Sequence, residues 1–194
     1  MPDTSKVITS QRYSQGFTYQ DYLAQVASNR ENYQQNDAAF KLSSEDAKFF
    51  KDFVQRHGGV KALAILEDWC PDAHRGLPII ANIAQASGME LRVFYRDKNP
   101  DIINLYLNQG KFQSIPVFAF FNKDLKPLCH WIERPAVATL FTEQVLAELT
   151  KKQLSEEEMR QERRKRNAAM SDGWRQETVR ELKELLAKTT TKIS

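Results

Sequence analysis

Cys70 is the residue of this chain that is best placed to do chemistry. The apolar run 62–66 is short enough for a buried strand, and a helical pattern of apolar residues starts after Pro71. Proline suits the first turn of a helix, because the N–H that it lacks would have no partner there. Cys70 is therefore expected beside a helix N-terminus, where free N–H groups and the helix dipole favour a thiolate. The spacing predicts a thiol that is more acidic and more reactive than a free cysteine.

The alternative for Cys70 is a buried structural cysteine, since cysteine is among the most buried residue types. Its neighbours Trp69 and Pro71, and its place at a helix start, favour a reactive or partner-facing thiol. Cys129 is expected in a strand as a buried free thiol, and two cysteines give no disulfide framework. The three histidines have no ligand spacing with these cysteines, so no metal site is expected.

Hydrophobic periodicity and helix caps divide the chain into helices and strands that must position this thiol. Strands are expected at 62–66, 90–95, 115–121 and 128–132, with a turn at 122–124. Helices are expected at 18–36, from Ser43 or Ser44 to Gly58, from Pro71 to Gly88, from Asn99 to Gly110, and from Pro135 along an apolar side of Val137, Leu140, Phe141, Val145, Leu146 and Leu149. The first two strands with the helix between them predict a right-handed parallel crossover, and the last two predict an antiparallel hairpin.

The segment Trp69-Cys70-Pro71 at a strand-to-helix junction, together with this order of elements, resembles the thioredoxin superfamily. The similarity is to a bacterial thioredoxin-like protein with Cys-Pro-Asp-Ala in place of Cys-x-x-Cys. It implies an α/β thioredoxin-like fold: a βαβ unit followed by ββα, with a mixed central sheet flanked by helices. The resemblance covers residues 43–152, which leaves 1–42 as an N-terminal arm and helix and 153–194 as a charged helical extension.

The resemblance also implies a site around Cys70 as the catalytic residue. Pro116 matches the cis-proline that faces the active cysteine in that fold, and Ile115 matches the residue whose backbone meets an extended substrate. A trans proline at a strand start is the commoner arrangement in general, but the position relative to Cys70 favours cis. The expected substrate groove is made of Trp69, Pro71, Asp72, Ala73, Ile115 and Pro116.

Two positions depart from the dithiol members of the superfamily. Ala73 stands where the resolving cysteine would be, and Ala64 stands where many thioredoxins have a buried aspartate. The acids Glu67 and Asp68 would raise the pKa of the thiol if they lay close to it. Asp72 either accepts amides of the first helical turn or lies on the solvated surface, with equal weight.

Two other polar residues near the junction are expected to have ordinary structural roles. His74 is expected either to form a hydrogen bond near the site or to be an exposed helix residue, and the exposed position is favoured. Arg134 is expected to contact a carboxylate that fixes its loop.

Three functions follow from these residues. The first is a single-cysteine thiol–disulfide oxidoreductase in which Cys70 exchanges with protein or small-molecule thiols and disulfides, with glutathione as a possible co-substrate and no bound cofactor. The second is a non-catalytic interaction module that keeps the groove. The third is a dithiol reductase whose resolving cysteine has been replaced by Ala73.

Composition and charge limit the partners. The chain has 28 basic and 25 acidic residues, a net charge of +3, and Glu156 to Glu158 adjoin the basic run Arg163 to Arg166, so no nucleic acid is expected. No stretch has the length and apolarity to cross a membrane, and the cytoplasm is the expected location. The C-terminal apolar stripe that includes Trp174 predicts a helix docked either on the domain or on a second subunit, and the second arrangement would be a homodimer.

Overall fold

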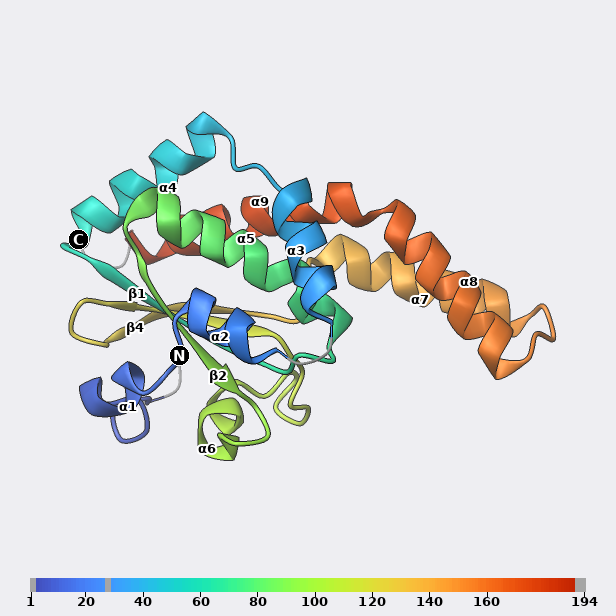
Figure 1. The fold of residues 1–194 in the computed structure, drawn as a ribbon, viewed down its shortest axis with the longest axis horizontal. Helices are drawn as coiled ribbons and strands as arrows, with labels where there is room; N and C mark the ends of the chain where they lie inside the picture. The colour runs from blue at the N-terminus through green and yellow to red at the C-terminus, as the bar shows by residue number, and fades with distance from the viewer. Residues whose placement is uncertain (1–2, 27–28, 191–194) are drawn as a thin grey trace.

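The protein is described here by a computed structural model, which covers residues 3–26 and 29–190 (Figure 1). Its centre is a mixed four-stranded sheet in the order β2-β1-β3-β4. The strands are β1 (Val60–Leu66), β2 (Glu90–Tyr95), β3 (Val117–Asn122) and β4 (Pro127–Ile132). β1 runs parallel to β2 and antiparallel to β3, and β3 and β4 form the antiparallel hairpin. This is the α/β thioredoxin-like arrangement that the sequence predicts.

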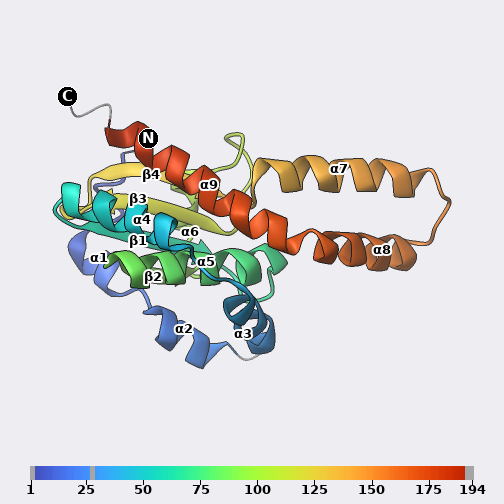
Figure 2. The same ribbon diagram turned by 90° about the horizontal axis from the view of Figure 1, so that it is seen from above.

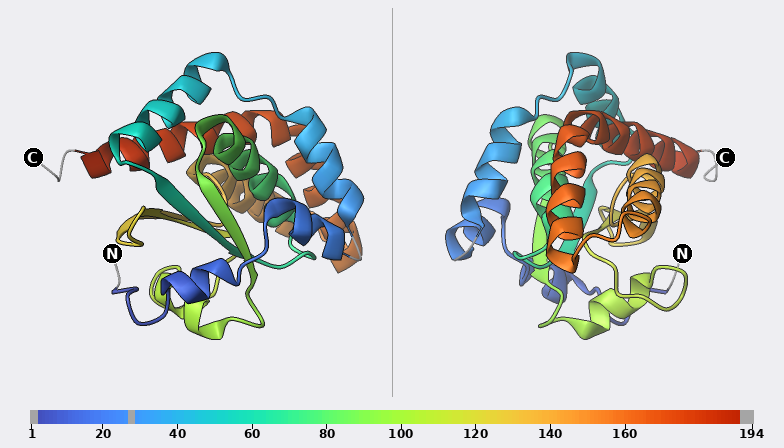
Figure 3. Two further views of the ribbon diagram at one scale, coloured as in Figure 1. Left: turned by 60° about the vertical axis from the view of Figure 1, so that its left-hand side comes forward. Right: turned by 90° about the vertical axis from the view of Figure 1, so that its right-hand side faces the viewer.

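Two of the helices on one face of the sheet begin and end at residues that the sequence marks as helix caps. They are α4 (Ser44–Arg56) and α5 (Pro71–Ser87). The Ser43 hydroxyl accepts the N–H of Asp46 at the start of α4, and Gly88 ends α5 with a φ of 78°. Figure 3 shows α4, α5 and the C-terminal helix α9 (Ser171–Thr190) on one side of the sheet, and α1 (Ser10–Ser14) and α6 (Pro100–Ile103) on the other.

The N-terminal segment lies on the sheet rather than apart from it. Tyr13 is buried, and its hydroxyl lies 3.0 Å from the carbonyl oxygen of Ala62 and 2.9 Å from that of Glu90. Phe17 exchanges backbone hydrogen bonds of 2.9 and 2.8 Å with Val93, which extends the edge of the sheet beyond β2. These contacts join residues before the predicted domain to its central strands.

The single helix expected at 18–36 is wrong, because the chain forms two helices there. These are α2 (Tyr19–Gln25) and α3 (Arg30–Ala39). Val26 is extended and Asn29 has a φ of 67°, so neither continues a helix, and residues 27 and 28 lie outside the described residues. Both helices pack inward, with Tyr22 and Tyr33 fully buried.

The helix expected from Asn99 to Gly110 is much shorter than predicted. α6 passes into a single 3₁₀ turn at Asn104–Tyr106, and Leu107 is extended. Asn108 then pairs with Phe112 across a turn in which Gly110 has a φ of 70°. Gly110 therefore serves this turn and does not end a helix.

The helix that begins after Pro135 is present, but it does not cover the sheet. α7 (Ala136–Thr150) and α8 (Glu156–Ala169) form a helical hairpin that projects from the body, as Figures 1 and 2 show. We call residues 136–169 the arm. On α7, Val137 is 40 % exposed and Leu140 is 59 % exposed, although the sequence placed both on a packing side.

The helix that packs on the core beside β4 and α5 is α9 instead. Its apolar stripe is buried at Val179, Leu182 and Leu186, so this helix docks on its own domain. Glu181 fixes the junction with the arm, because its carboxylate accepts the indole N–H of Trp131 and the N–H of Ala136, each at 2.8 Å. The domain limits at 42 and 152 remain a prediction. Among the described residues, no helix combines the length and the apolar character that a membrane span needs.

Candidate thiol site at the start of helix α5

Cys70 lies where β1 has ended and α5 begins. It is the N-cap residue of α5, with Pro71 in the first turn, and its carbonyl accepts the N–H of His74 at 3.2 Å. Its own N–H donates to the carbonyl of Glu67 at 3.2 Å, which closes a turn between strand and helix. The residue is 6 % exposed, and its Sγ lies 3.5 Å from the carbonyl oxygen of Ile115. The thiol is thus fixed between the helix N-terminus and the segment before β3.

That segment carries a cis peptide bond between Ile115 and Pro116. Both residues are buried, and the Pro116 carbonyl accepts the N–H of Glu133 at 2.7 Å. α5 approaches this segment closely, because a Cβ on Gly76 would lie 3.0 Å from the Phe118 ring and 3.5 Å from Pro116. Helix α5 therefore packs tightly on the segment that holds the cis bond, and the Cys70 thiol contacts this segment at the Ile115 carbonyl.

Asp72 is buried and bound by two arginines, which rules out the solvated surface position considered for it. It is 8 % exposed, and its carboxylate pairs with Arg75 and, at 2.7 Å, with Arg134. Arg134 also contacts Glu133 at 2.5 Å. The arginine and carboxylate contact expected in this loop is confirmed, and it extends to α5. These ion pairs join the first turn of α5 to the base of the arm.

The environment of the Cys70 thiol is less favourable to a thiolate than the sequence predicts. Burial is the largest influence and raises the pKa of the thiol above its usual range. The N–H groups of Ala73 and Asp72 act in the opposite direction, as does Arg134, while the Asp72 carboxylate raises the pKa further. The expectation of a thiol more acidic than a free cysteine is wrong, because desolvation outweighs the helix N-terminus.

Comparison with known proteins agrees with this geometry. A family model described as Thioredoxin matches residues 16–148. The chain belongs to this thioredoxin family. The matched range begins in the N-terminal segment that pairs with β2 and ends within α7.

Two solved structures share the thioredoxin fold over nearly the whole chain. One is a protein of unknown function from Pseudomonas aeruginosa, with a TM-score of 0.67, 14 % identity, and coverage of 94 % of this chain and 99 % of that one. The other is an HIV epitope scaffold, with a TM-score of 0.64, 14 % identity, and coverage of 93 % and 99 %. At this identity the likeness shows the fold alone. The comparison with curated proteins finds no match.

This thioredoxin domain has no second thiol beside Cys70. Ala73 is fully buried one helical turn after it, and Ala64 is fully buried in β1. Cys129 is a free thiol in β4, 8 % exposed, and burial raises its pKa to about 12. Val117, the residue after Pro116, pairs with Ile132 of β4. Cys129 lies three residues before Ile132 in the same strand, so the distance between these two residues is roughly 10 Å. The expectation of a buried free thiol at Cys129 is confirmed.

His74 and Tyr33 support the site from behind; the sequence offered a hydrogen bond near the site as the less favoured role of His74 and did not indicate Tyr33. His74 is 6 % exposed instead of lying on the surface, and its Nε2 lies 2.6 Å from the carbonyl oxygen of Asp68. Its ring packs edge-on against Tyr33 with 4.9 Å between centroids, and the Tyr33 hydroxyl lies 2.9 Å from that of Tyr22. Burial lowers the pKa of His74, so the neutral ring fits this position. No sequence spacing could have paired Tyr33 with a histidine on another helix.

The outer side of the site is formed by Trp69 and Pro71, which are both exposed. Trp69 is 53 % exposed, and the Arg96 guanidinium lies over its ring at 5.2 Å. Glu67 turns inward, where its carboxylate accepts the N–H of Asp97 at 2.8 Å and burial raises its pKa. Within the described ranges, no three His, Cys, Asp or Glu residues are grouped to hold a metal ion.

Proposed function

We propose that this thioredoxin-family protein carries out single-cysteine thiol–disulfide exchange through Cys70. The observation that supports this most is the position of Sγ, 3.5 Å from the Ile115 carbonyl and beside the cis bond to Pro116. An extended disulfide-bearing chain that meets the backbone at Ile115 would bring its sulfur to Cys70. Exposed Trp69 gives such a chain an apolar surface next to the thiol.

The reaction has two balanced steps. The Cys70 thiolate attacks one sulfur of a disulfide, forms a mixed disulfide with that half, and releases the other half as a thiolate. A second thiolate, from a small thiol of the glutathione class, attacks the mixed disulfide and restores Cys70. With a glutathionylated protein as substrate, the sum is reduction of that protein and formation of oxidised glutathione.

The second thiol comes from outside the chain in this scheme. Ala73 has no sulfur, and Cys129 is a buried free thiol whose pKa of about 12 keeps it protonated. A compartment with a thiol pool, such as the cytoplasm, supplies the co-substrate and also suits two free cysteines.

The raised pKa of Cys70 gives the reaction a definite pH dependence. The thiolate is the nucleophile, and its fraction at neutral pH is small when the pKa lies above the usual range. The rate should therefore rise with pH across the neutral range and keep rising above it. A disulfide that binds beside Cys70 does not replace the N–H groups of Asp72 and Ala73. These groups therefore continue to stabilise the Cys70 thiolate.

Turnover of a glutathionylated peptide by the full chain, with excess reduced glutathione, tests this function. Cys70→Ser should lower the rate by about 100-fold or more, because serine is a far weaker nucleophile towards sulfur. Cys129→Ser is the matched control and should keep the wild-type rate. Equal rates for the wild type and Cys70→Ser would contradict the proposal.

Burial of the Cys70 thiol and its raised pKa favour a second candidate, a non-catalytic module that binds extended peptides in the same groove. This candidate predicts peptide binding that Cys70→Ser does not weaken, with no turnover. The variant Ala73→Cys distinguishes these two candidates from a third, a dithiol reductase whose resolving cysteine has been replaced by Ala73. It places a thiol at i+3 from Cys70, so the variant, reduced beforehand, would reduce one equivalent of a disulfide without glutathione and end with an internal disulfide to Cys70 only in that third case.

A further inference from the structure

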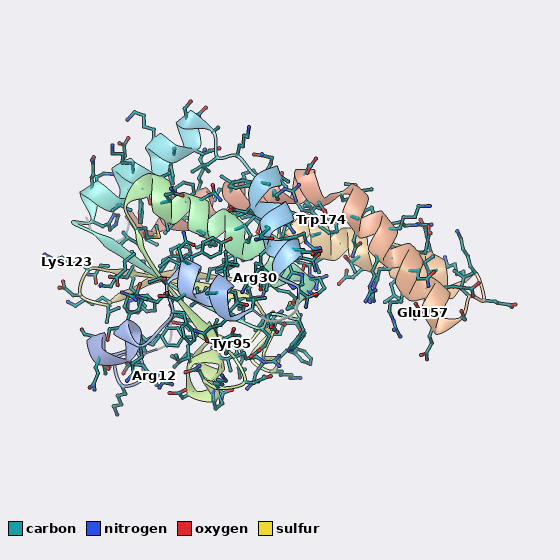
Figure 4. All side chains as sticks on the ribbon, in the orientation of Figure 1. Arg12, Arg30, Tyr95, Lys123, Glu157 and Trp174 are labelled. Carbon is teal, nitrogen blue, oxygen red and sulfur yellow. The ribbon has the colours of Figure 1, made fainter. Side chains whose placement is uncertain are left out.

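The arm has an uncovered helix at its edge. α8 has no buried residue, whereas α7 buries Ala138, Val145 and Leu149. Figures 1 and 2 agree that the hairpin extends away from the sheet. In Figure 4, Glu157 lies on the arm and Lys123 lies at the opposite end of the molecule. A 14-residue helix that packs only on its neighbours along one side leaves a face about 21 Å long open to a partner.

The side of α8 that faces α7 can be recognised from its contacts. Met159, Glu162 and Arg166 are half-buried, and Arg166 pairs with Glu148 of α7 at 2.7 Å. With 3.6 residues per turn, the exposed surface of α8 that runs from its outer side to one edge of the hairpin presents a stripe that we call the outer stripe. It consists of five exposed residues: Glu157, Glu158, Gln161, Arg164 and Lys165.

The charges of the outer stripe are complementary to those of the same stripe in a second copy that runs in the opposite direction. Its first turn is acidic, its centre is Gln161, and its last turn is basic. When two such helices run antiparallel with Gln161 opposite Gln161, residues on the same side of the stripe face each other, so Glu157 meets Arg164 and Glu158 meets Lys165 of the other copy. Two-fold symmetry makes each of these pairs twice.

We propose that α8 is the contact surface of a two-fold symmetric homodimer, in which the outer stripes of two copies pair antiparallel around Gln161. An isologous interface needs a patch that complements itself, and this charge order provides one. Electrostatic complementarity of this kind fixes register and orientation between partners. α9 does not provide the contact, since its apolar stripe is buried on the sheet of its own domain.

The charges of the stripe are available for such a contact. Arg164 and Lys165 form no ion pair with any other residue of the described ranges. Glu157 has only Arg160, one turn away at 3.2 Å, and both side chains are more than half exposed. α8 as a whole carries four acidic and five basic residues, so its near-neutral surface does not favour a polyanion as partner.

Sedimentation equilibrium of the full chain at two salt concentrations tests the dimer. At about 10 mM salt the screening length is ~30 Å and the charge pairs act fully, whereas at about 1 M it is ~3 Å. The expected result is a monomer–dimer equilibrium at low salt that shifts to monomer at high salt. A monomer at low salt at every concentration that stays in solution would overturn the proposal.

Charge reversal then locates the contact. Glu157→Lys puts lysine opposite Arg164 at both ends of the interface, and Arg164→Glu puts glutamate opposite Glu157. Each variant alone should dimerise about tenfold more weakly or worse than the wild type. A mixture of the two should regain association as a heterodimer, because every reversed charge then faces its opposite. Failure of the mixture to associate more strongly than either variant alone would rule out antiparallel pairing of this stripe.

Two controls keep this test independent of folding and of net charge. Both substituted residues are exposed, and Glu158 is left in place because its carboxylate completes the capping box with Ser155. Asp124→Lys changes the net charge as Glu157→Lys does, but it lies next to Lys123, far from the arm. It should dimerise as the wild type does. An equal weakening by Asp124→Lys would mean that net charge, and not the outer stripe, governs association.

Discussion

Leu182→Ala and Leu140→Ala make the same change on two C-terminal helices and should have very different costs. Leu182 on α9 is fully buried, whereas Leu140 on α7 is 59 % exposed. The sequence alone gives both residues an apolar helical side. The pair of variants therefore tests whether α9, and not α7, belongs to the core of the domain.

The burial of each side chain sets the expected magnitude. Removal of a fully buried leucine side chain down to alanine costs about 2–5 kcal/mol, as lost transfer free energy and a residual cavity. Leu140 has already left more than half of its surface in water, and alanine has a slightly better helix propensity. Its replacement should cost about 0.5 kcal/mol or less. The difference between the two free energies of unfolding should exceed about 1.5 kcal/mol.

Urea unfolding followed by far-UV circular dichroism measures both values on the full chain. For a chain of this length, a loss of 1 kcal/mol lowers Tm by roughly 2–4 °C, so Leu182→Ala should melt about 4–20 °C below the wild type. Leu140→Ala should melt within about 2 °C of it. A larger loss of stability for Leu140→Ala than for Leu182→Ala would refute the assignment of α9 to the core.

Three further predictions concern the N-terminal segment and the thiol site. Gly16→Ala should destabilise the protein by about 1–3 kcal/mol in urea, because the new Cβ would lie 2.5 Å from a ring carbon of Phe94. The stability that neutral His74 contributes should decline as pH falls below about 6.5, since burial lowers its folded pKa and the unfolded chain takes up the proton first. Unfolding at pH 7 and pH 5 should show a smaller gap between the wild type and His74→Gln at the lower pH. Asp72→Asn should raise the alkylation rate of Cys70 at pH 7 by about three- to tenfold, because the carboxylate that raises the pKa of the thiol is gone.

Local sequence signals predicted most of the elements that position the site. The apolar run of β1, Pro71 in the first turn and Gly88 at the end of α5 have direct physical causes, and the structure places each as expected. The pairing of β1 with β2 and β3 follows from the order of the elements. These features depend on neighbours in the sequence or on short connections.

The features that sequence analysis missed depend on contacts between distant segments. α7 and α9 both have an apolar side, and only tertiary contacts such as the bond from Trp131 to Glu181 decide which of them covers the sheet. Asp72 resembles a helix-start acid on the surface until Arg134 is brought beside it. Burial of Cys70 likewise comes from the packing of distant segments, and it reverses the sign of the pKa shift that the helix start alone predicts.

The central claim is that Cys70 is the sulfur that exchanges with disulfides, and its most direct test is reaction of the full chain with oxidised glutathione. Intact mass and peptide mass spectrometry would score Cys70 and Cys129 separately in one sample. The account predicts a glutathione adduct on Cys70, formed faster at higher pH and removed by reduced glutathione, with Cys129 unmodified. No adduct on Cys70, or an adduct on Cys129 alone, would contradict it.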